Sequence, residues 1–251
     1  MFAQNLGLET VELKAMLRKP RRNRTAQLDL RMLSGLQRIR FFDSSLMDVP
    51  ALPPSVRILD LENSSFEEFK YHSSDSETML PYLPRLEYFH CTRAPSMGTG
   101  NHYIKILRRA HTDGVSNLKS LRLISNQDYH IPLLPEALGA MTVPNLQHIT
   151  LGNELMVTDD VLDVITNRCP ALQSLDLEKS AVTGAGVLRL IRTREGTLRR
   201  LNLTDCSAKV SADVVGYARE LGIQVDYANT GEPGKCKTWT GYAFDPDLLT
   251  A

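Results

Sequence analysis

The sequence has little of what marks several specialised classes of protein. Only four of its 251 residues are cysteines, and none of them form the CxxC pairs of a structural zinc or redox site. There is no signal-peptide pattern at the start and no apolar run of 18 residues anywhere. Lys and Arg number 29, as do Asp and Glu, so no net positive charge favours nucleic acid. We therefore expect a soluble protein of the reducing cytoplasm or nucleus, with neither a membrane nor a nucleic acid as its partner.

Motifs for catalysis and metal binding are also missing from the sequence. It contains no GxSxG, no HExxH and no phosphate-binding GxxxxGK followed by Ser or Thr. The six histidines never fall at the spacing of metal ligands. We therefore expect no enzymatic activity, no metal and no cofactor.

What the sequence does contain is a six-residue phrase, apolar at positions one, four and six, that recurs every 20 to 32 residues. The clearest copies are LKSLRL (118–123), LQHITL (146–151), LQSLDL (172–177) and LRRLNL (198–203). Weaker copies are LQRIRF (36–41), VRILDL (56–61), LEYFHC (86–91) and GIQVDY (222–227). Eight copies are too many to be chance, so we interpret the chain as a repeat protein.

The phrase predicts a short strand, because alternating apolar residues place positions four and six on one face. One such strand cannot bury that face alone, whereas strands stacked about 4.8 Å apart form a parallel sheet over a continuous core. This pattern is typical of the leucine-rich repeat. The predicted fold is an α/β solenoid of about eight repeats, with the parallel sheet on the concave face and helices or extended segments on the convex face.

The segments between phrases predict what covers the convex face. Three of them start with Val followed by Thr or Ser and continue with a helical stripe of apolar residues, at 157–165, 182–191 and 210–215. Thr158 is a candidate N-cap of the first of these helices. The segment 46–56 has three prolines in five residues, so it is predicted to be extended.

The run from Val157 to Leu203, with its Cys-Pro-x-Leu-x-x-Leu-x-Leu and Val-Thr-x-x-x-Val elements, resembles a known class of repeats. These are the cysteine-containing leucine-rich repeats of F-box substrate receptors and of antagonist-of-mitotic-exit-network proteins. The resemblance extends over about residues 118–227, although Ser180 stands where the family usually has the cysteine that Cys206 matches. It implies a receptor that brings a client protein to a ubiquitin ligase through a Skp-type adaptor and a cullin.

The family's docking module, the F-box, is not recognisable in the 35 residues before the first clear repeat. The sequence therefore leaves two functions open. The chain is either the client-binding part of an F-box receptor whose F-box lies elsewhere, or a stand-alone scaffold or inhibitor with no link to a ubiquitin ligase.

The register of the phrase also predicts which side chains project from the concave face toward a client. Its centre combines aromatic, cationic and apolar groups, a mixture that is enriched in protein interfaces. The predicted partner-binding residues are Tyr88, His90, Arg122, Ile124, His148, Asp176 and Arg200. The alternative is that these side chains only solvate the sheet and pair with neighbours on adjacent strands, as Asp60 would with Arg40.

The rest of the chain is predicted to flank or interrupt these repeats. Residues 1–35 are expected to be an irregular N-terminal cap with a basic run at 18–24, residues 36–228 the repeats, and residues 229–251 a C-terminal cap or tail. Within the cap, 10–18 fit a short helix and 27–30 an extra strand, and the sequence does not decide this segment. Polar surface loops are expected at 72–78 and 94–101, and partial burial is expected for Trp239.

Overall fold

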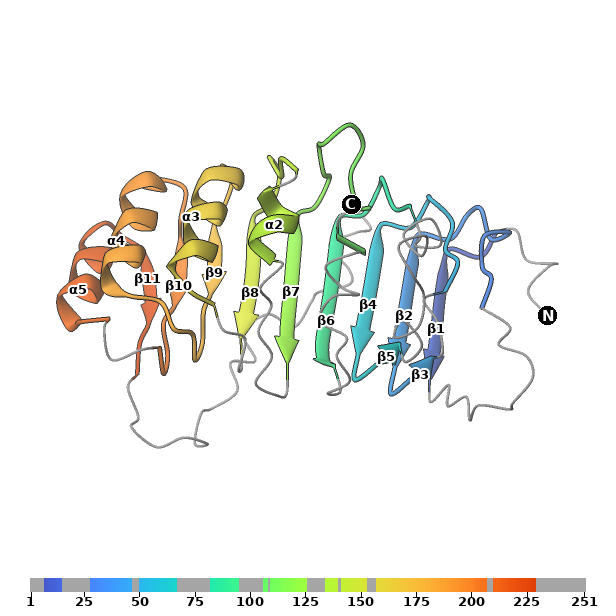
Figure 1. Cartoon of the computed structure of the whole chain (residues 1–251), viewed down its shortest axis with the longest axis horizontal. Coiled ribbons are helices and arrows are strands. Elements are labelled where there is room, and N and C mark those ends of the chain that lie inside the picture. The colour runs from blue at the N-terminus through green and yellow to red at the C-terminus, as the bar shows by residue number, and fades with distance from the viewer. Residues whose placement is uncertain are drawn as a thin grey trace.

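The chain folds around one nine-stranded sheet in which every neighbouring pair of strands is parallel (Figure 1). The strand order is β1-β2-β4-β6-β7-β8-β9-β10-β11, so each strand of this sheet pairs with the strand of the same sheet that follows it along the chain. This α/β arrangement of regularly spaced strands is consistent with a repeat solenoid. The computed structural model describes residues 7–14, 28–46, 50–66, 82–94, 106–107, 109–125, 134–139, 141–152, 157–206 and 210–228.

The strands of this sheet are short, and the helices lie between strands in the C-terminal half. The sheet strands are β1 (Thr10–Lys14), β2 (Arg38–Phe42), β4 (Ile58–Glu62), β6 (Tyr88–Ala94), β7 (Ser120–Ser125), β8 (His148–Gly152), β9 (Ser174–Asp176), β10 (Arg200–Asn202) and β11 (Gln224–Asp226). A second, two-stranded sheet pairs β3 (Ser45–Leu46) with β5 (Ser65–Phe66). The helices are α2 (Leu134–Gly139), α3 (Asp159–Arg168), α4 (Gly184–Thr193) and α5 (Ala212–Glu220).

All eight predicted phrases form strands, and their apolar positions supply the core. The residues at position four are buried in every one of these strands: Ile39, Leu59, Phe89, Leu121, Ile149, Leu175, Leu201 and Val225. Position six is also buried, apart from the last copy, where Tyr227 packs partly exposed against the core. The period-two pattern therefore predicted the inward face correctly.

The sequence left the segment at residues 10–18 open, with a short helix as one possibility, and the structure instead places β1 at Thr10–Lys14. Val11 and Leu13 face inward and pair in register with Ile39 and Phe41 of β2. Residues 8–13, LETVEL, carry the same apolar pattern as the other phrases, with Leu8 at position one. Because apolar and polar residues alternate in this segment, it forms a ninth strand with its apolar side on the core, and not a short helix.

Main-chain hydrogen bonds repeat from strand to strand in the same way. The carbonyl at position two of a phrase accepts the N–H groups of positions two and three of the next phrase. This occurs in seven successive steps, from Glu9 O through Gln37, Arg57, Glu87, Lys119 and Gln147 to Gln173 O. Every step uses only main-chain atoms, so the spacing of the strands does not depend on the outward side chains.

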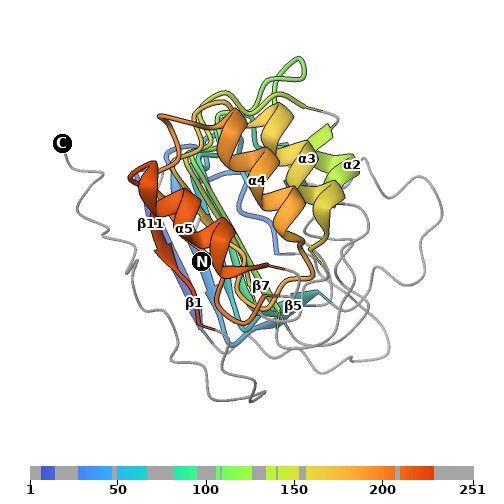
Figure 2. The same cartoon turned by 90° about the vertical axis from the view of Figure 1, so that its left-hand side faces the viewer.

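Helices cover one face of the C-terminal half of the sheet (Figure 2). In that view β1 and β11 lie on the side of β7 that is away from α2, α3 and α4, so the sheet curves with its hollow face turned away from these helices. The predicted helical segments are confirmed as α3, α4 and α5. Thr158 does occupy the N-cap position of α3, but its side chain makes no capping hydrogen bond, whereas Thr183 Oγ1 accepts one from Gly186 N at the start of α4.

The contact between α3 and α4 explains why position 186 is glycine. Asp159 accepts hydrogen bonds from Thr183 N at 2.8 Å and Thr183 Oγ1 at 2.6 Å. A Cβ atom on Gly186 would lie 2.4 Å from Asp159 Oδ1, which is closer than nonbonded atoms approach. Arg189 adds an ion pair to Asp163 at 3.1 Å on the exposed side of the same two helices.

The connection between β2 and β4 is extended where the structure describes it, as the prolines predicted. Between β2 and β4 the described residues contain β3 and an isolated parallel bridge from Asp29 to Ala51, and no helix. That bridge lies in the segment where an extra strand was considered, but it involves one residue on each side. A turn at Pro53–Val56 then leads into β4.

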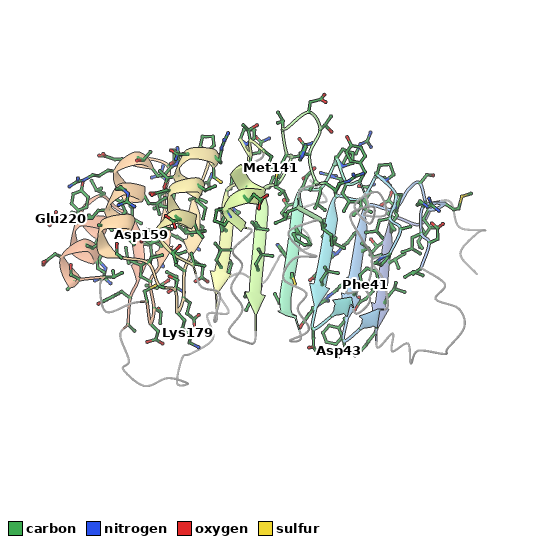
Figure 3. All side chains as sticks on the ribbon, viewed as in Figure 1. Phe41, Asp43, Met141, Asp159, Lys179 and Glu220 are labelled. Atoms are coloured by element: carbon green, nitrogen blue, oxygen red, sulfur yellow. The ribbon has the colours of Figure 1, made fainter. Side chains whose placement is uncertain are left out.

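One position at the carboxyl edge of the sheet repeats with an unusual backbone conformation. Two residues past position six, φ is positive at Asp43, Asn63, Lys179 and Asp205. Figure 3 places Asp43 and Lys179 at this same edge of the sheet. The next residue is buried in each case: Ser44, Ser64, Ser180 and Cys206. Ser180 Oγ and Cys206 Sγ lie 3.4 Å apart, so these two residues are equivalent in space as well as in sequence.

Several predictions concern residues outside the described part of the chain. These are the basic run at 18–24, the loops at 72–78 and 95–101, and the tail at 229–251 with Trp239.

Candidate protein-binding face

The candidate site is the hollow face of the sheet, which we call the concave face. It is made by positions three, five and seven of each phrase, whose side chains point away from the core. Strand pairing aligns them in rows that run across the sheet. The row at position five contains Glu12, Arg40, Asp60, His90, Arg122, Thr150, Asp176, Asn202 and Asp226.

The structure brings five of the seven predicted site residues together on three adjacent strands. Tyr88 and His90 come from β6, Arg122 and Ile124 from β7, and His148 from β8. In register, Arg122 lies between His90 and Thr150, and Ser120 lies between Tyr88 and His148. All five predicted residues are partly exposed. We call this set of five the central cluster.

Arg122 is the only formal charge in the central cluster when the histidines are neutral. Its nearest carboxylates in the same row, Asp60 and Asp176, are each two strands away. Among the residues that the structure describes, Arg122 has no hydrogen bond and no ion pair within 4 Å, and its Nε is buried without a partner. A guanidinium has five N–H donors, so this side chain retains unused capacity to bind an acceptor.

His90 is neutral at physiological pH. Burial lowers the pKa of His90 to about 4, and the positive charges of Arg122 and Arg38 act in the same direction. Its Nε2 lies 3.1 Å from Ser120 Oγ, within hydrogen-bond distance. His90 therefore adds no charge beside Arg122, and the neutral ring separates Arg122 from Asp60.

His148 is shifted toward its neutral form in the same way. Burial lowers the pKa of His148, and the positive charge of Arg200 adds to the effect. Arg200 lies in the row at position three, two strands beyond His148. The two histidines are also two strands apart and in different rows, as the sequence predicted, so they do not form a metal site together.

Asp176 is placed differently from the prediction that it contacts a partner. It lies on the concave face, but only 6% of it is exposed. Its Oδ1 accepts a hydrogen bond from Glu178 N at 3.1 Å, so the carboxylate is turned back onto its own main chain. Burial raises the pKa of Asp176 to about 6. Arg200, the seventh predicted residue, lies on the neighbouring strand and is partly exposed.

The N-terminal end of the concave face is paired within itself. Arg40 contacts three carboxylates, at 2.6 Å to Glu62, 3.4 Å to Asp60 and 4.0 Å to Glu12. The predicted pairing of Arg40 with Asp60 is therefore confirmed, although the shortest contact is to Glu62. Phe42 completes this end, with the Lys14 ammonium 5.0 Å from the centre of its ring.

One contribution to this face was missed by the sequence reasoning. It is β1, which supplies Glu12 and Lys14, and the phrase LETVEL at 8–13 would have revealed it. Ser120 lies on the face as the register predicts, one strand away from His90, which it contacts. Ile58, at position three of its phrase, is 5% exposed while lying outside the main core cluster.

In the described ranges, no three His, Cys, Asp or Glu side chains gather closely enough to hold a metal ion. Within those ranges there is also no helix that is long and apolar enough to cross a membrane. Cys91, Cys169 and Cys206 are buried free thiols.

Comparison with known proteins found no relatives. No family model matches this sequence, and no curated protein is detectably similar to it.

Proposed function

We propose that this chain is a leucine-rich-repeat protein that binds a client protein on its concave face and performs no catalysis itself. The observation that carries the proposal is the contrast on that face between charges that are paired internally and the central Arg122, which is not. A surface that only had to be hydrated would gain nothing from a half-buried guanidinium that has no ion pair among the described residues, because taking a charge out of water costs free energy unless the charge is paired.

The composition of the central cluster supports the same proposal. Tyrosine and arginine are the residue types that most often dominate binding energy at protein interfaces, and they do so at the centre of the contact. Here Tyr88 and Arg122 lie on neighbouring strands, with the apolar Ile124 in the adjoining row. The sheet is curved, and this face is on its hollow side.

Within this function, we favour the client-binding part of an F-box receptor, which would act with a Skp-type adaptor and a cullin. The support is the resemblance of residues 157–203 to the cysteine-containing repeats of that family. The equivalent placement of Ser180 and Cys206 fits the repeat in which the family has a cysteine. The alternative is a stand-alone scaffold or inhibitor, which would bind through the same face without those two partners.

The first test replaces the central cluster. The variant Tyr88→Ala, Arg122→Gln, His148→Ala should lose capture of the client without lowering the unfolding midpoint, since these side chains point away from the core. The matched control changes three exposed residues on the helical side, Asp160→Ala on α3, Arg192→Ala on α4 and Glu220→Ala on α5. Proteins from native cell extract that the wild type and the control retain, and the central variant does not, are the clients. Equal retention by all three would reject the concave face as the site.

The second test separates the two functions. Quantitative mass spectrometry of proteins that copurify with the full chain should find a Skp-type adaptor and a cullin in stoichiometric amounts if this chain is a receptor that carries its own docking element. Their absence beside a stoichiometric client would mean either a stand-alone scaffold or inhibitor, or a client-binding part whose F-box lies elsewhere. Because neither adaptor nor cullin needs the concave face, the central variant should retain both.

A further inference from the structure

We propose that the client offers Arg122 the carboxylate of an aspartate or glutamate in a segment that lies across the strands of the concave face. This inference rests on the proposed function, since it names the chemistry that the same face recognises. It is carried by charge complementarity: the centre of the face holds one guanidinium that has no ion pair within 4 Å among the described residues, and Asp60 and Asp176 act on it only from two strands away.

The comparison of Arg122 with Arg40 shows that the missing partner is specific to the centre. Both residues occupy position five of their phrases, on β7 and β2. Arg40 has three carboxylates within 4.0 Å, all supplied by the two strands beside its own. The corresponding neighbours of Arg122 are His90 and Thr150, neither of which carries a negative charge. No described residue on an adjacent strand therefore supplies Arg122 with a carboxylate, which leaves that role to the client.

The neighbours of Arg122 suit a bound carboxylate. Thr150 and Ser120 present hydroxyl groups next to it, and Tyr88 adds a phenol one row away. Hydroxyl groups can donate a hydrogen bond to the same oxygens that the guanidinium holds. Charge-assisted bonds of this kind are stronger than neutral ones, and they gain further where the surface is partly dry.

The surrounding charges favour a carboxylate over a phosphate. Phosphate groups are usually read by clusters of arginines, because they carry nearly two negative charges. The central cluster offers one guanidinium, and Asp60 and Asp176 lie two strands away on either side. These carboxylates would repel the second charge of a phosphate more than they would repel a single one. One aspartate or glutamate is thus the better match.

The spacing of the row adds an expectation about the segment. Two strands of the sheet span about 10 Å, and an extended peptide covers that distance in about three residues. A segment that crosses the strands with its acidic residue on Arg122 therefore places the residues three before and three after it near Asp60 and Asp176. Acidic residues are expected to be disfavoured at both of those places.

The test uses a library of random 12-residue peptides displayed on phage, selected on the immobilised full-length chain. Selected peptides should share one aspartate or glutamate and should avoid acidic residues three positions away on either side. A fluorescein-labelled synthetic copy of the most enriched peptide then gives dissociation constants by anisotropy. Arg122→Gln should weaken binding about 10- to 100-fold, as expected for a buried charge pair that loses one partner. The control Arg40→Gln should change binding less than about threefold, since Arg40 is already paired.

A charge exchange gives the most specific readout. Binding lost in Arg122→Glu should return when the acidic residue of the peptide is replaced by lysine. Replacing that acidic residue with its amide should cost as much as Arg122→Gln, and the two changes together should cost no more than either alone.

The outcomes that overturn the inference are distinct from those that overturn the proposed function. If no peptide is selected, or if the selected peptides lack a shared acidic residue, acidic recognition is rejected. Tighter binding on replacing the acidic residue with phosphoserine would instead assign the site to phosphate. If Tyr88→Ala with His148→Ala abolishes binding while Arg122→Gln has no effect, the concave face remains the binding site and only the role of Arg122 fails. If none of these changes affects binding, both proposals fail.

Discussion

The two halves of the sheet use the same strands but differ on both of their faces. In the N-terminal half, the described connection between β2 and β4 is extended, and the concave face is closed by the ion pairs of Arg40. From β7 onward, helices α2 to α5 cover the far side, and the central Arg122 has no counter-ion in the described residues. The strand phrase therefore specifies the sheet in both halves, while the residues that vary around it decide how each half is covered and what its face can bind.

The largest expected effect tests whether the two halves are stabilised separately. Phe41 is fully buried on β2, so Phe41→Ala should lower the free energy of unfolding by about 3–5 kcal/mol. Each strand contacts mainly its neighbours, so the loss should be concentrated in the N-terminal half. Hydrogen exchange should speed up in β1, β2 and β4 and stay unchanged in β9, β10 and β11. Uniformly faster exchange would show that the halves unfold as one unit.

The helical half can be tested at two glycines that differ in their surroundings. Gly186→Ala would push Asp159 away from Thr183 and lose two hydrogen bonds to a carboxylate, whereas a Cβ on Gly216 in α5 would meet nothing within 4 Å. Gly216→Ala should stabilise the protein, because alanine favours the helix by up to about 1 kcal/mol. Gly186→Ala should destabilise it. Chemical denaturation should place the two variants about 2–3 kcal/mol apart, and similar midpoints would contradict the close contact of α3 and α4.

A smaller effect, with a defined pH dependence, is expected at the buried carboxylate of the C-terminal half. Asp176 has a pKa of about 6 in the folded chain, against an ordinary value of 3.8, because burial disfavours its charge. The folded state then binds this proton more tightly than the unfolded state does. The contribution of Asp176 to the free energy of unfolding is therefore fully present below about pH 4 and is lost as the pH rises through 6. Asp176→Asn should therefore stabilise the protein by about 2 kcal/mol at pH 8.

The gain from Asp176→Asn should shrink below pH 6 and vanish near pH 4, as measured by thermal unfolding across that range. Asn202 on β10 is the natural precedent, since its Oδ1 accepts from Thr204 N in the same way that Asp176 accepts from Glu178 N. The reverse change, Asn202→Asp, should destabilise the chain at pH 8. A gain that does not depend on pH would show that the charge of Asp176 carries no cost.

The smallest effect separates the two arginines of the position-five row. Arg40→Gln leaves Glu12, Asp60 and Glu62 without their shared partner, and we expect a loss of about 1 kcal/mol, since these groups are partly exposed. Arg122→Gln should change stability by less than about 0.5 kcal/mol, because no counter-ion in the described residues is lost. Equal losses for the two variants would remove the distinction on which the proposed binding chemistry rests.

How far the sequence predicted this structure depended on whether a feature is local. The alternating apolar residues predicted eight strands and the face that each strand buries, because alternation can be read from neighbouring residues in the sequence. The strand at Thr10–Lys14 was missed because a stretch of mixed polar and apolar residues also suits a short helix, and only pairing with Ile39 and Phe41 decides between them. The register gave the composition of the concave face, and with it the pairing of Arg40 with Asp60.

The state of each side chain on that face could not be predicted in the same way. The burial of Asp176 depends on its carboxylate turning onto Glu178 N, and the unpaired state of Arg122 depends on which residues the neighbouring strands happen to supply. Both facts arise from contacts between residues far apart in the sequence. The candidate site was therefore predicted as a surface, but its electrostatics required the structure.

The main-chain bonds that link seven successive carbonyls to the next strand have a consequence for how this protein can change over evolution. Because the stack is held by atoms that every residue type shares, outward residues are free to be exchanged without altering its pitch. A new specificity can thus arise one strand at a time, with each intermediate still folded. The same property makes the concave face a suitable starting point for engineered recognition, in which a library varies only the outward positions of adjacent strands.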